Sequence, residues 1–180
     1  MQEWKTLSRT TILRHSKFLE VENHAVELPD GRVIPDWPWV KSPDYVNVIV
    51  KEGDAFLFFR QTKYAVRGTS LAPVGGYLDP GEDPMTAAVR ELREEIGYAA
   101  TEWHSLGSYA ADGNRGGGIA NLYFARDAKY SSTPVVDDLE EQEIVRLTPE
   151  ETRAALDAGE FKVLAWATAT ALALLLDKRE

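Results

Sequence analysis

A mixed α/β (α+β) fold is predicted for this chain of 180 residues by the order of its segments. Short stretches rich in β-branched and aromatic residues, separated by Gly, Pro and Asp turn signals, occupy most of the chain as far as Arg126. The segment from Pro84 to Gly97 interrupts them with the start and stop signals of a helix, and two more helical segments follow after Thr148. Strands and helices in one short chain indicate the mixed class.

Composition and charge exclude several classes of function. The 20 Lys and Arg against 29 Asp and Glu leave a formal net charge of −9, which argues against a nucleic-acid partner. There is no cysteine, so disulfides, thiol catalysis and cysteine-bound metals are excluded. The first ten residues lack the apolar core of a signal peptide, and the apolar run Val163–Leu176 is too short to span a bilayer. We expect a cytoplasmic protein of one compact core with no membrane partner.

Three strands are predicted in the N-terminal part, over Thr10–Leu13, Phe18–Leu28 and Arg32–Val40, with a hairpin turn at Pro29–Arg32. The last of them contains two tryptophans around a proline. Trp37 and Trp39 would either stack on a nucleobase, which is worth about 1–3 kcal/mol per base, or pack a dimer interface or the edge of the core. The sequence does not distinguish between these two tryptophans.

A hairpin of two apolar strands, Tyr45–Lys51 and Ala55–Gln61, follows. The second strand ends in basic side chains. Arg60, Lys63 and Arg67 are candidates for contacts with an anionic substrate, although exposed cations at strand ends are common on any protein surface.

The helix expected after Asp83 carries an unusual cluster of carboxylates. Asp83 suits the N-cap, Pro84 the first turn and Gly97 the C-terminal stop. Glu91 and Glu95 are four residues apart, so they leave the same face of the helix and repel each other. A solvated acidic face is one explanation, and a site for a hard cation, to which Glu94 would add a third carboxylate, is the other.

The remainder of the chain is predicted as strands Trp103–Ala111, Ile119–Arg126 and Ile144–Leu147, then helices Pro149–Gly159 and Val163–Leu176. A glycine-rich loop, residues 111–118, joins the first two strands and contains Arg115, which would bind a phosphate or remain solvated. An acidic loop over residues 137–143 precedes the third strand. The capping box of the first helix is Thr148 with Glu151, and the second helix is apolar on most sides, so we expect it to be buried between the sheet and a partner.

The carboxylate-rich helix and its lead-in resemble the Nudix box, G-x5-E-x7-R-E-U-x-E-E-x-G-U, where U is apolar. Seven fixed residues of that pattern are present, and only the final aliphatic place differs, being Tyr98. The matching residues are Gly76, Glu82, Arg90, Glu91, Leu92, Glu94, Glu95 and Gly97.

This resemblance implies a Nudix fold, an α/β/α sandwich around a mixed sheet, and metal-assisted hydrolysis of a nucleoside diphosphate linked to another moiety. It implies Mg²⁺ as cofactor, with Mn²⁺ as a substitute, held by Glu91, Glu95, Glu94 and the carbonyl of Gly75. Glu94 would alternatively position a water, Arg90 would pair with a glutamate to orient it, and Glu82 would support them from outside the metal shell.

Flanking segments resemble the ADP-ribose and nucleotide-sugar pyrophosphatase branch of the family. These are the N-terminal strands, Arg60-Gln61 and the run Asn121–Ala128. The branch implies an N-terminal sheet, residues 1–42, for dimerisation and base binding, a hydrolase domain, residues 43–180, a homodimer, and a small nucleotide-sugar substrate. It also implies a catalytic glutamate in the acidic loop, for which Glu141 and Glu140 are the candidates, followed by Glu143.

Two differences from the pattern of this branch leave the identity of the substrate undetermined. Ala72 stands where the branch has a glutamate, and Asp112 or Gly113 stands where many ADP-ribose enzymes have a proline. GDP-mannose, another nucleotide sugar, a dinucleotide or a nucleoside triphosphate are alternatives to ADP-ribose. A non-catalytic sensor of nucleotide sugars is the alternative outside the enzymes.

Overall fold

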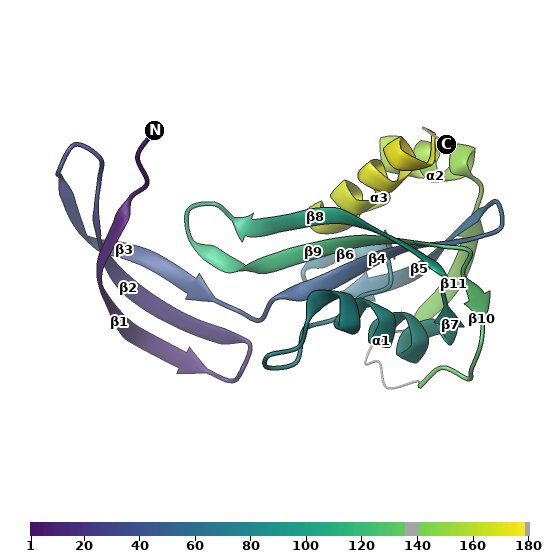
Figure 1. Ribbon diagram of the computed structural model, residues 1–180, viewed down its shortest axis with the longest axis horizontal. Coiled ribbons are helices and arrows are strands. Elements are labelled where there is room, and N and C mark those ends of the chain that lie inside the picture. Colours follow the sequence, from purple (N-terminus) through teal and green to yellow (C-terminus); the bar gives the residue numbers. More distant parts are fainter. Residues whose placement is uncertain (136–140, 179–180) are drawn as a thin grey trace. The chain divides into compact units, whose positions relative to one another are not determined.

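The computed structural model describes residues 1–135 and 141–178, which divide into two compact units (Figure 1). Unit 1 consists of Met1–Asp44 with Tyr109–Ile119, and unit 2 of Tyr45–Ser108 with Ala120–Glu180. Strands β8 (Glu102–Asp112) and β9 (Gly116–Arg126) contribute residues to both units.

Unit 1 is built on an antiparallel sheet of β1 (Lys5–His15), β2 (Leu19–Glu27) and β3 (Val33–Lys41). All three N-terminal strands were predicted: β1 is longer than expected, β2 is one residue shorter at each end, and β3 is shifted by one residue. Strand β2 alternates, because its even-numbered side chains from Glu22 to Val26 are buried on one face. The turn between β2 and β3 is closed by the Leu28 amide, which donates to the carbonyl of Arg32 at 2.8 Å.

The predicted glycine loop of residues 111–118 is wrong at both ends, because β8 extends to Asp112 and Gly116–Gly118 already belong to β9. All three glycines have φ between 84° and 87°, a region that side chains with a Cβ rarely adopt. A Cβ on Gly116 would also lie 2.7 Å from the carbonyl oxygen of Val40 and 2.8 Å from the ring of Trp39. Glycine is therefore needed here so that a strand can pass close to β3, and it does not indicate a long loop.

Unit 2 contains a mixed sheet in which β9 runs parallel to β4 and the neighbouring pairs are antiparallel. The sequence did not predict β6, since basic and glycine residues obscure its apolar C-terminal end. The strands other than β8 and β9 are β4 (Tyr45–Glu52), β5 (Ala55–Lys63), β6 (Val66–Ala72) and β11 (Gln142–Leu147), with a separate short pair β7 (Tyr98–Ala99) and β10 (Lys129–Tyr130).

Helices cover both faces of the unit 2 sheet, which confirms the predicted Nudix-type layering (Figure 1). Phe58 of β5 packs edge-on against Phe161, which lies between α2 (Pro149–Asp157) and α3 (Leu164–Asp177), at 4.9 Å between ring centres. The next residue on β5, Phe59, is buried on the opposite face of the pleat, and α1 (Pro84–Ile96) packs against the neighbouring strand β4. The core between these layers includes Val46, Val48, Ile49, Phe56, Leu71, Leu92, Leu122 and Phe124.

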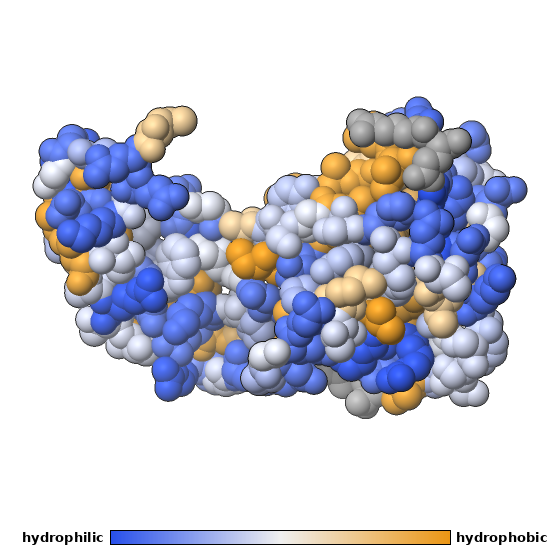
Figure 2. Space-filling model, in the orientation of Figure 1, coloured by the Kyte–Doolittle hydropathy of each residue, from blue (hydrophilic) through white to orange (hydrophobic). Residues whose placement is uncertain are grey.

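The C-terminal helix α3 is anchored by charge as well as by packing. Asp177 accepts hydrogen bonds from Lys51 at 2.6 Å and from Arg126 at 2.9 Å, and all three side chains are mostly buried. The outer side of α3 stays apolar, since Leu164 and Leu175 are exposed, and Figure 2 shows hydrophobic surface over this helix. None of the helices in the described residues is long and apolar enough to cross a membrane.

Candidate active site

The helix that carries the acidic cluster, α1, begins and ends as its sequence predicts. The side chain of Asp83 accepts a hydrogen bond from the amide of Thr86 at 3.0 Å, and Gly97 ends the helix in the left-handed conformation, with φ 74°. The buried face consists of Ala87, Ala88, Leu92 and Ile96. Outside this face, the side chain of Glu94 is partly exposed, while that of Glu91 is mostly buried.

Arg90 is the centre of the cluster and binds three glutamates. Its Nε and Nη2 each donate to Glu82 at 2.9 Å, which is a two-point contact with one carboxylate. Its Nη1 donates to Glu91 at 2.6 Å and to Glu94 at 3.2 Å. The predicted pairing of Arg90 with a glutamate is therefore seen in the structure, and one guanidinium offsets the repulsion within the cluster.

The surroundings of the cluster shift the pKa values of Glu82 and Glu91 in opposite directions. Hydrogen bonds from Arg90 lower the pKa of Glu82 to about 2, and the amide of Asp79 supports the shift from 2.9 Å. Glu91 behaves differently, because burial raises its pKa even though Arg90 opposes the change. A buried carboxylate held against an arginine is a group that gains from a cation, which would replace the hydration that burial removes.

Gly75 and Gly76, which precede the helix, lie beside two glutamates of the Nudix box, Glu95 and Glu91. A Cβ on Gly76 would lie 2.3 Å from Oε1 of Glu91, so the carboxylate occupies the space that a side chain would need. Oε2 of Glu95 accepts a hydrogen bond from the amide of Gly75 at 2.9 Å. The fold thus brings Gly75, Glu91, Glu94 and Glu95 of the predicted metal set to one end of the loop–helix segment.

Within residues 1–135 and 141–178, however, no group of three or more His, Cys, Asp or Glu side chains has the spacing of a metal site. In this structure Arg90 binds the carboxylates of Glu91 and Glu94, and the amide of Gly75 donates to Glu95. The roles predicted for these residues in metal binding and catalysis stay predictions.

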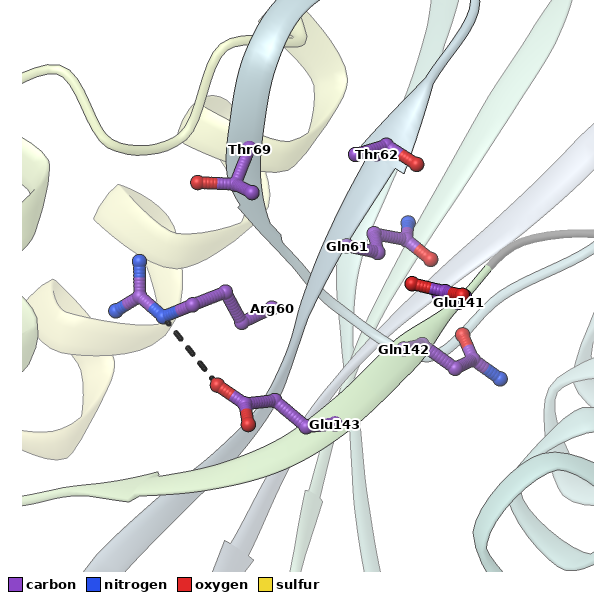
Figure 3. A pocket seen from close by; sticks show the side chains of 7 residues that line it. All are labelled: Arg60, Gln61, Thr62, Thr69, Glu141, Gln142 and Glu143. Atoms are coloured by element: carbon purple, nitrogen blue, oxygen red, sulfur yellow. Dashed lines mark ion pairs between the residues drawn. The ribbon is translucent and has the colours of Figure 1, made fainter.

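A second cluster of predicted residues lines a cavity of about 350 Å³ in unit 2 (Figure 3). Glu141 lies near Gln61 there, while the other acidic-loop candidate, Glu140, is outside the described residues. Strands β5, β6 and β11 and the residue before β11 supply its lining, which is Arg60, Gln61, Thr62, Thr69, Glu141, Gln142 and Glu143.

The pleat of β5 separates Arg60 from Gln61. Arg60 pairs with Glu143 at 3.9 Å and with Glu160 at 3.3 Å, and in Figure 3 it points away from Gln61 and Glu141. Arg60 therefore lies on the face of the sheet that α2 and α3 cover. Arg60 thus has two acidic partners in the protein, and its role in substrate binding stays a prediction.

Two of the other basic candidates, Lys63 and Arg67, lie in strands on either side of the β5–β6 turn, and Arg115 lies in a turn. Lys63 ends β5, and Arg67 follows the turn, where its carbonyl accepts a hydrogen bond from Lys162 at 2.8 Å. Arg115 belongs to unit 1, and its amide donates to Asp112 at 3.0 Å. Nothing in these contacts tests a role in substrate binding.

Trp37 and Trp39 line a cavity of about 350 Å³ in unit 1. Trp4 packs edge-on against Trp37 at 5.2 Å between ring centres, and His24 stacks on Trp39 at 5.3 Å with 17° between the planes. The sequence did not single out Trp4 or His24 for this site, because their approach depends on the pairing of β1, β2 and β3.

The comparisons with known proteins agree with this geometry. The model of the NUDIX domain matches residues 41–167, and the model of the nucleoside diphosphate sugar hydrolase N-terminal domain matches residues 4–40. The chain belongs to the Nudix family. With every charged residue of the Nudix box present, it is a Nudix pyrophosphohydrolase.

Relatives of this Nudix protein have several names. The chain is 28% identical to a methanol dehydrogenase activator of Bacillus methanolicus, over 83% of this chain and 80% of the relative. It is 25% identical to an ADP-ribose pyrophosphatase of Bacillus subtilis (strain 168), over 88% and 85%. A solved structure, described as an ADP compounds hydrolase, is similar in fold with a TM-score of 0.82 at 23% identity, over 99% of this chain and 96% of that one.

Proposed function

We propose that this Nudix protein hydrolyses the diphosphate bond of ADP-ribose or a related nucleoside diphosphate sugar, giving a nucleoside monophosphate and a sugar phosphate. The observation that carries the proposal is the grouping of Glu82, Glu91 and Glu94 around the guanidinium of Arg90. The names of the pyrophosphatase from Bacillus subtilis and of the solved ADP compounds hydrolase support an adenosine diphosphate portion in the substrate.

The residues of the box fit a divalent cation, and we assign it to Mg²⁺ with Mn²⁺ as a substitute. Glu91, Glu94, Glu95 and the carbonyl of Gly75 offer only hard oxygen ligands, which these ions prefer. The missing side chain at Gly76 leaves the carboxylate of Glu91 the room that it occupies. When bound, the cation supplies Lewis-acid stabilisation of the charge on the phosphoryl oxygens.

The protein's own groups supply orientation and proton transfer. Arg90 binds the carboxylate of Glu91, and Glu82 binds Arg90 in turn, so we propose that Arg90 and Glu82 act as positioning residues for Glu91. Glu141 is the candidate general base, with Glu140 as the alternative, and Glu94 would position the attacking water. A well-placed base contributes typically about 10²–10⁴-fold to the rate. Lys63, Arg67 and Arg115 stay candidates for the substrate's phosphates or ribose, and Arg60 is a weaker one.

Unit 1 is proposed to bind the base. Trp37 and Trp39 line its cavity of about 350 Å³, which is within the size range of small-molecule sites, and aromatic rings are the side chains on which bases stack. We further infer that residues 1–42 form a subdomain that pairs two copies into a homodimer, beside a hydrolase domain of residues 43–180. The support is that β1 is an exposed edge strand of 11 residues with Leu7, Ile12 and Leu13 on its surface.

The proposal is tested by replacing Glu95 with Gln, which keeps the shape but removes the charge. With ADP-ribose and Mg²⁺, we expect turnover to fall by at least about 100-fold, while AMP still binds. Glu150→Gln, on the exposed surface of α2, is the matched control and should keep wild-type turnover. Unchanged turnover in Glu95→Gln, or no cleavage of any diphosphate in a broad panel, would falsify the proposal.

The same panel decides the substrate. It contains ADP-ribose, GDP-mannose, other nucleotide sugars, dinucleotides and nucleoside triphosphates, and products are separated by chromatography. Hydrolysis in heavy-oxygen water then shows which phosphorus receives the oxygen. Cleavage of triphosphates ahead of all sugar-linked diphosphates would contradict the nucleotide-sugar assignment.

A further inference from the structure

Asn47 is a polar residue in a buried strand of unit 2. It lies in β4 between Val46 and Val48, which are fully buried, and its own exposed fraction is 5%. Asparagine is depleted in strands, and a buried polar side chain is normally hydrogen-bonded. The carboxamide oxygen of Asn47, however, has no hydrogen-bond partner among residues 1–135 and 141–178. A buried acceptor of this kind calls for an ordered water or an ion as its partner.

The fold places Asn47 directly beside Gly75. Hydrogen bonds from the amides of Val46 and Val48 pair β4 with residues 74–76, at 2.9 and 2.8 Å. This pairing puts Asn47 opposite Gly75, and a Cβ on Gly75 would lie 2.6 Å from Nδ2 of Asn47. The missing side chain at position 75 therefore leaves the room that the carboxamide occupies.

Gly75 also contacts the Nudix box. Its amide donates to Oε2 of Glu95 at 2.9 Å, and its carbonyl is among the groups assigned above to the cation. Asn47 and Glu95 thus lie against the same glycine. Mg²⁺ usually keeps several water molecules when a protein binds it, and polar groups outside the ligand shell hold such waters and ligands in position. An acceptor without a protein partner beside Gly75 is suited to that role.

A second buried side-chain atom lacks a partner in the described part of the chain, namely Oγ1 of Thr152 on α2. Helix α2 packs against β5, β11 and α3, whereas the glutamates of the Nudix box lie on and before α1. Thr152 therefore resembles Asn47 in burial and in its unpartnered atom, but it lies away from the cation site. This makes it a matched control.

We propose that Asn47 is a positioning residue of the cation site, whose carboxamide oxygen accepts a hydrogen bond from a water of the bound cation. The inference rests on the proposed Mg²⁺ site of the Nudix box. Asn47 lies outside the box in the sequence, and the pairing of β4 with residues 74–76 brings it to the site. Loss of such a group typically weakens metal binding by about 10–100-fold.

The test measures Mn²⁺ binding to the full chain by electron paramagnetic resonance, which detects the free ion. Asn47→Leu, similar in shape but without an acceptor, should raise the Kd for Mn²⁺ by at least about tenfold. Asn47→Asp keeps an acceptor at the same place and adds charge, so its Kd should stay at or below the wild-type value. Thr152→Val removes the other unpartnered atom and should keep the wild-type Kd.

Thermal unfolding in EDTA distinguishes this role from a structural one. Replacing a buried acceptor that has no partner by an apolar group of similar shape costs the fold little, so Asn47→Leu should melt at the wild-type temperature or above it. Mn²⁺ should then raise the Tm of the wild type more than that of the variant, because it binds the wild type more tightly. A lower Tm of Asn47→Leu in EDTA, with Mn²⁺ binding weakened in Asn47→Asp as well, would overturn the proposal in favour of a role in the fold.

The failures of the two proposals are distinguishable. If the wild type binds no Mn²⁺, or if Glu91→Gln binds it as the wild type does, the cation site of the Nudix box is wrong and the role of Asn47 falls with it. If Glu91→Gln loses Mn²⁺ but Asn47→Leu keeps the wild-type Kd, the cation site stands and Asn47 takes no part in it.

Discussion

Oε1 of Glu91 lies 2.3 Å from the place where a Cβ on Gly76 would stand. A side chain at position 76 and the present position of the Glu91 carboxylate therefore exclude each other. Because Arg90 also holds this carboxylate, at 2.6 Å, a shift of Glu91 disturbs the whole cluster. The glycine that opens the Nudix box is thus a requirement of packing against the helix, in addition to any role in the loop.

The first prediction concerns Gly76→Ala. We expect turnover of ADP-ribose to fall by about 100-fold, the cost of displacing a catalytic group by about 1 Å, with a smaller change in KM. Steady-state kinetics with Mg²⁺ measure both constants, and circular dichroism shows whether the variant is folded. Wild-type turnover in a folded Gly76→Ala protein would show that the position of Glu91 is not critical.

The second prediction concerns pH. Arg90 lowers the pKa of Glu82 from its usual 4.5 to about 2, so ionised Glu82 stabilises the folded state fully above about pH 4.5. This contribution is lost as the pH falls through the folded pKa of about 2. The free-energy difference between the wild type and Glu82→Gln, from urea unfolding, should be constant at neutral pH and shrink below about pH 4.5. Glu3→Gln, at the exposed N-terminal end, should show no such dependence; a pH-independent Glu82→Gln difference would contradict the assignment.

The third prediction distinguishes the roles of Glu141 and Arg60, which line the same cavity in unit 2. Glu141→Gln should lower kcat by about 10²-fold or more if Glu141 is the general base. Arg60→Met should leave KM for ADP-ribose within about twofold, because Arg60 pairs with Glu143 and Glu160 instead. Its exposed ion pairs contribute at most about 1 kcal/mol to stability. A large rise in KM for Arg60→Met would restore Arg60 as a substrate ligand.

The fourth prediction concerns the capping box of α2. Thr148 accepts from the amide of Glu151 at 3.2 Å, and Glu151 accepts from the amide of Thr148 at 2.8 Å. Thr148→Ala should lower the free energy of unfolding by about 0.5–2 kcal/mol, measured by urea denaturation, without a change in KM. Thr101→Ala, at an exposed position outside any helix, provides the comparison and should be close to neutral. Equal stability of the two variants would show that the cap contributes little.

Local chemistry in the sequence was sufficient for much of the fold. Caps such as Asp83, Gly97 and Thr148 depend on residues within four positions, and each is found where it was predicted. The Nudix box likewise identifies the family from the sequence alone. The spacing of its glutamates also predicts which of their side chains share one face of α1. Strand β6 was missed because Arg67 and Gly68 obscure the strand pattern in its first half, and its pairing with β5 is what identifies it in the structure.

Partners across the fold were decided only by the tertiary structure. Helical spacing predicts that Glu91 and Glu95 are neighbours, yet it does not show that Arg90 binds Glu82, Glu91 and Glu94 together. Glu94 lies one turn along the same helix as Arg90, but Glu82 precedes the helix, and its contact depends on the path of the folded loop. The sequence by itself determined the family and the carboxylates available for its chemistry. The structure decided which groups hold them, and which face of the sheet Arg60 occupies, because pleat and packing set the direction of each side chain.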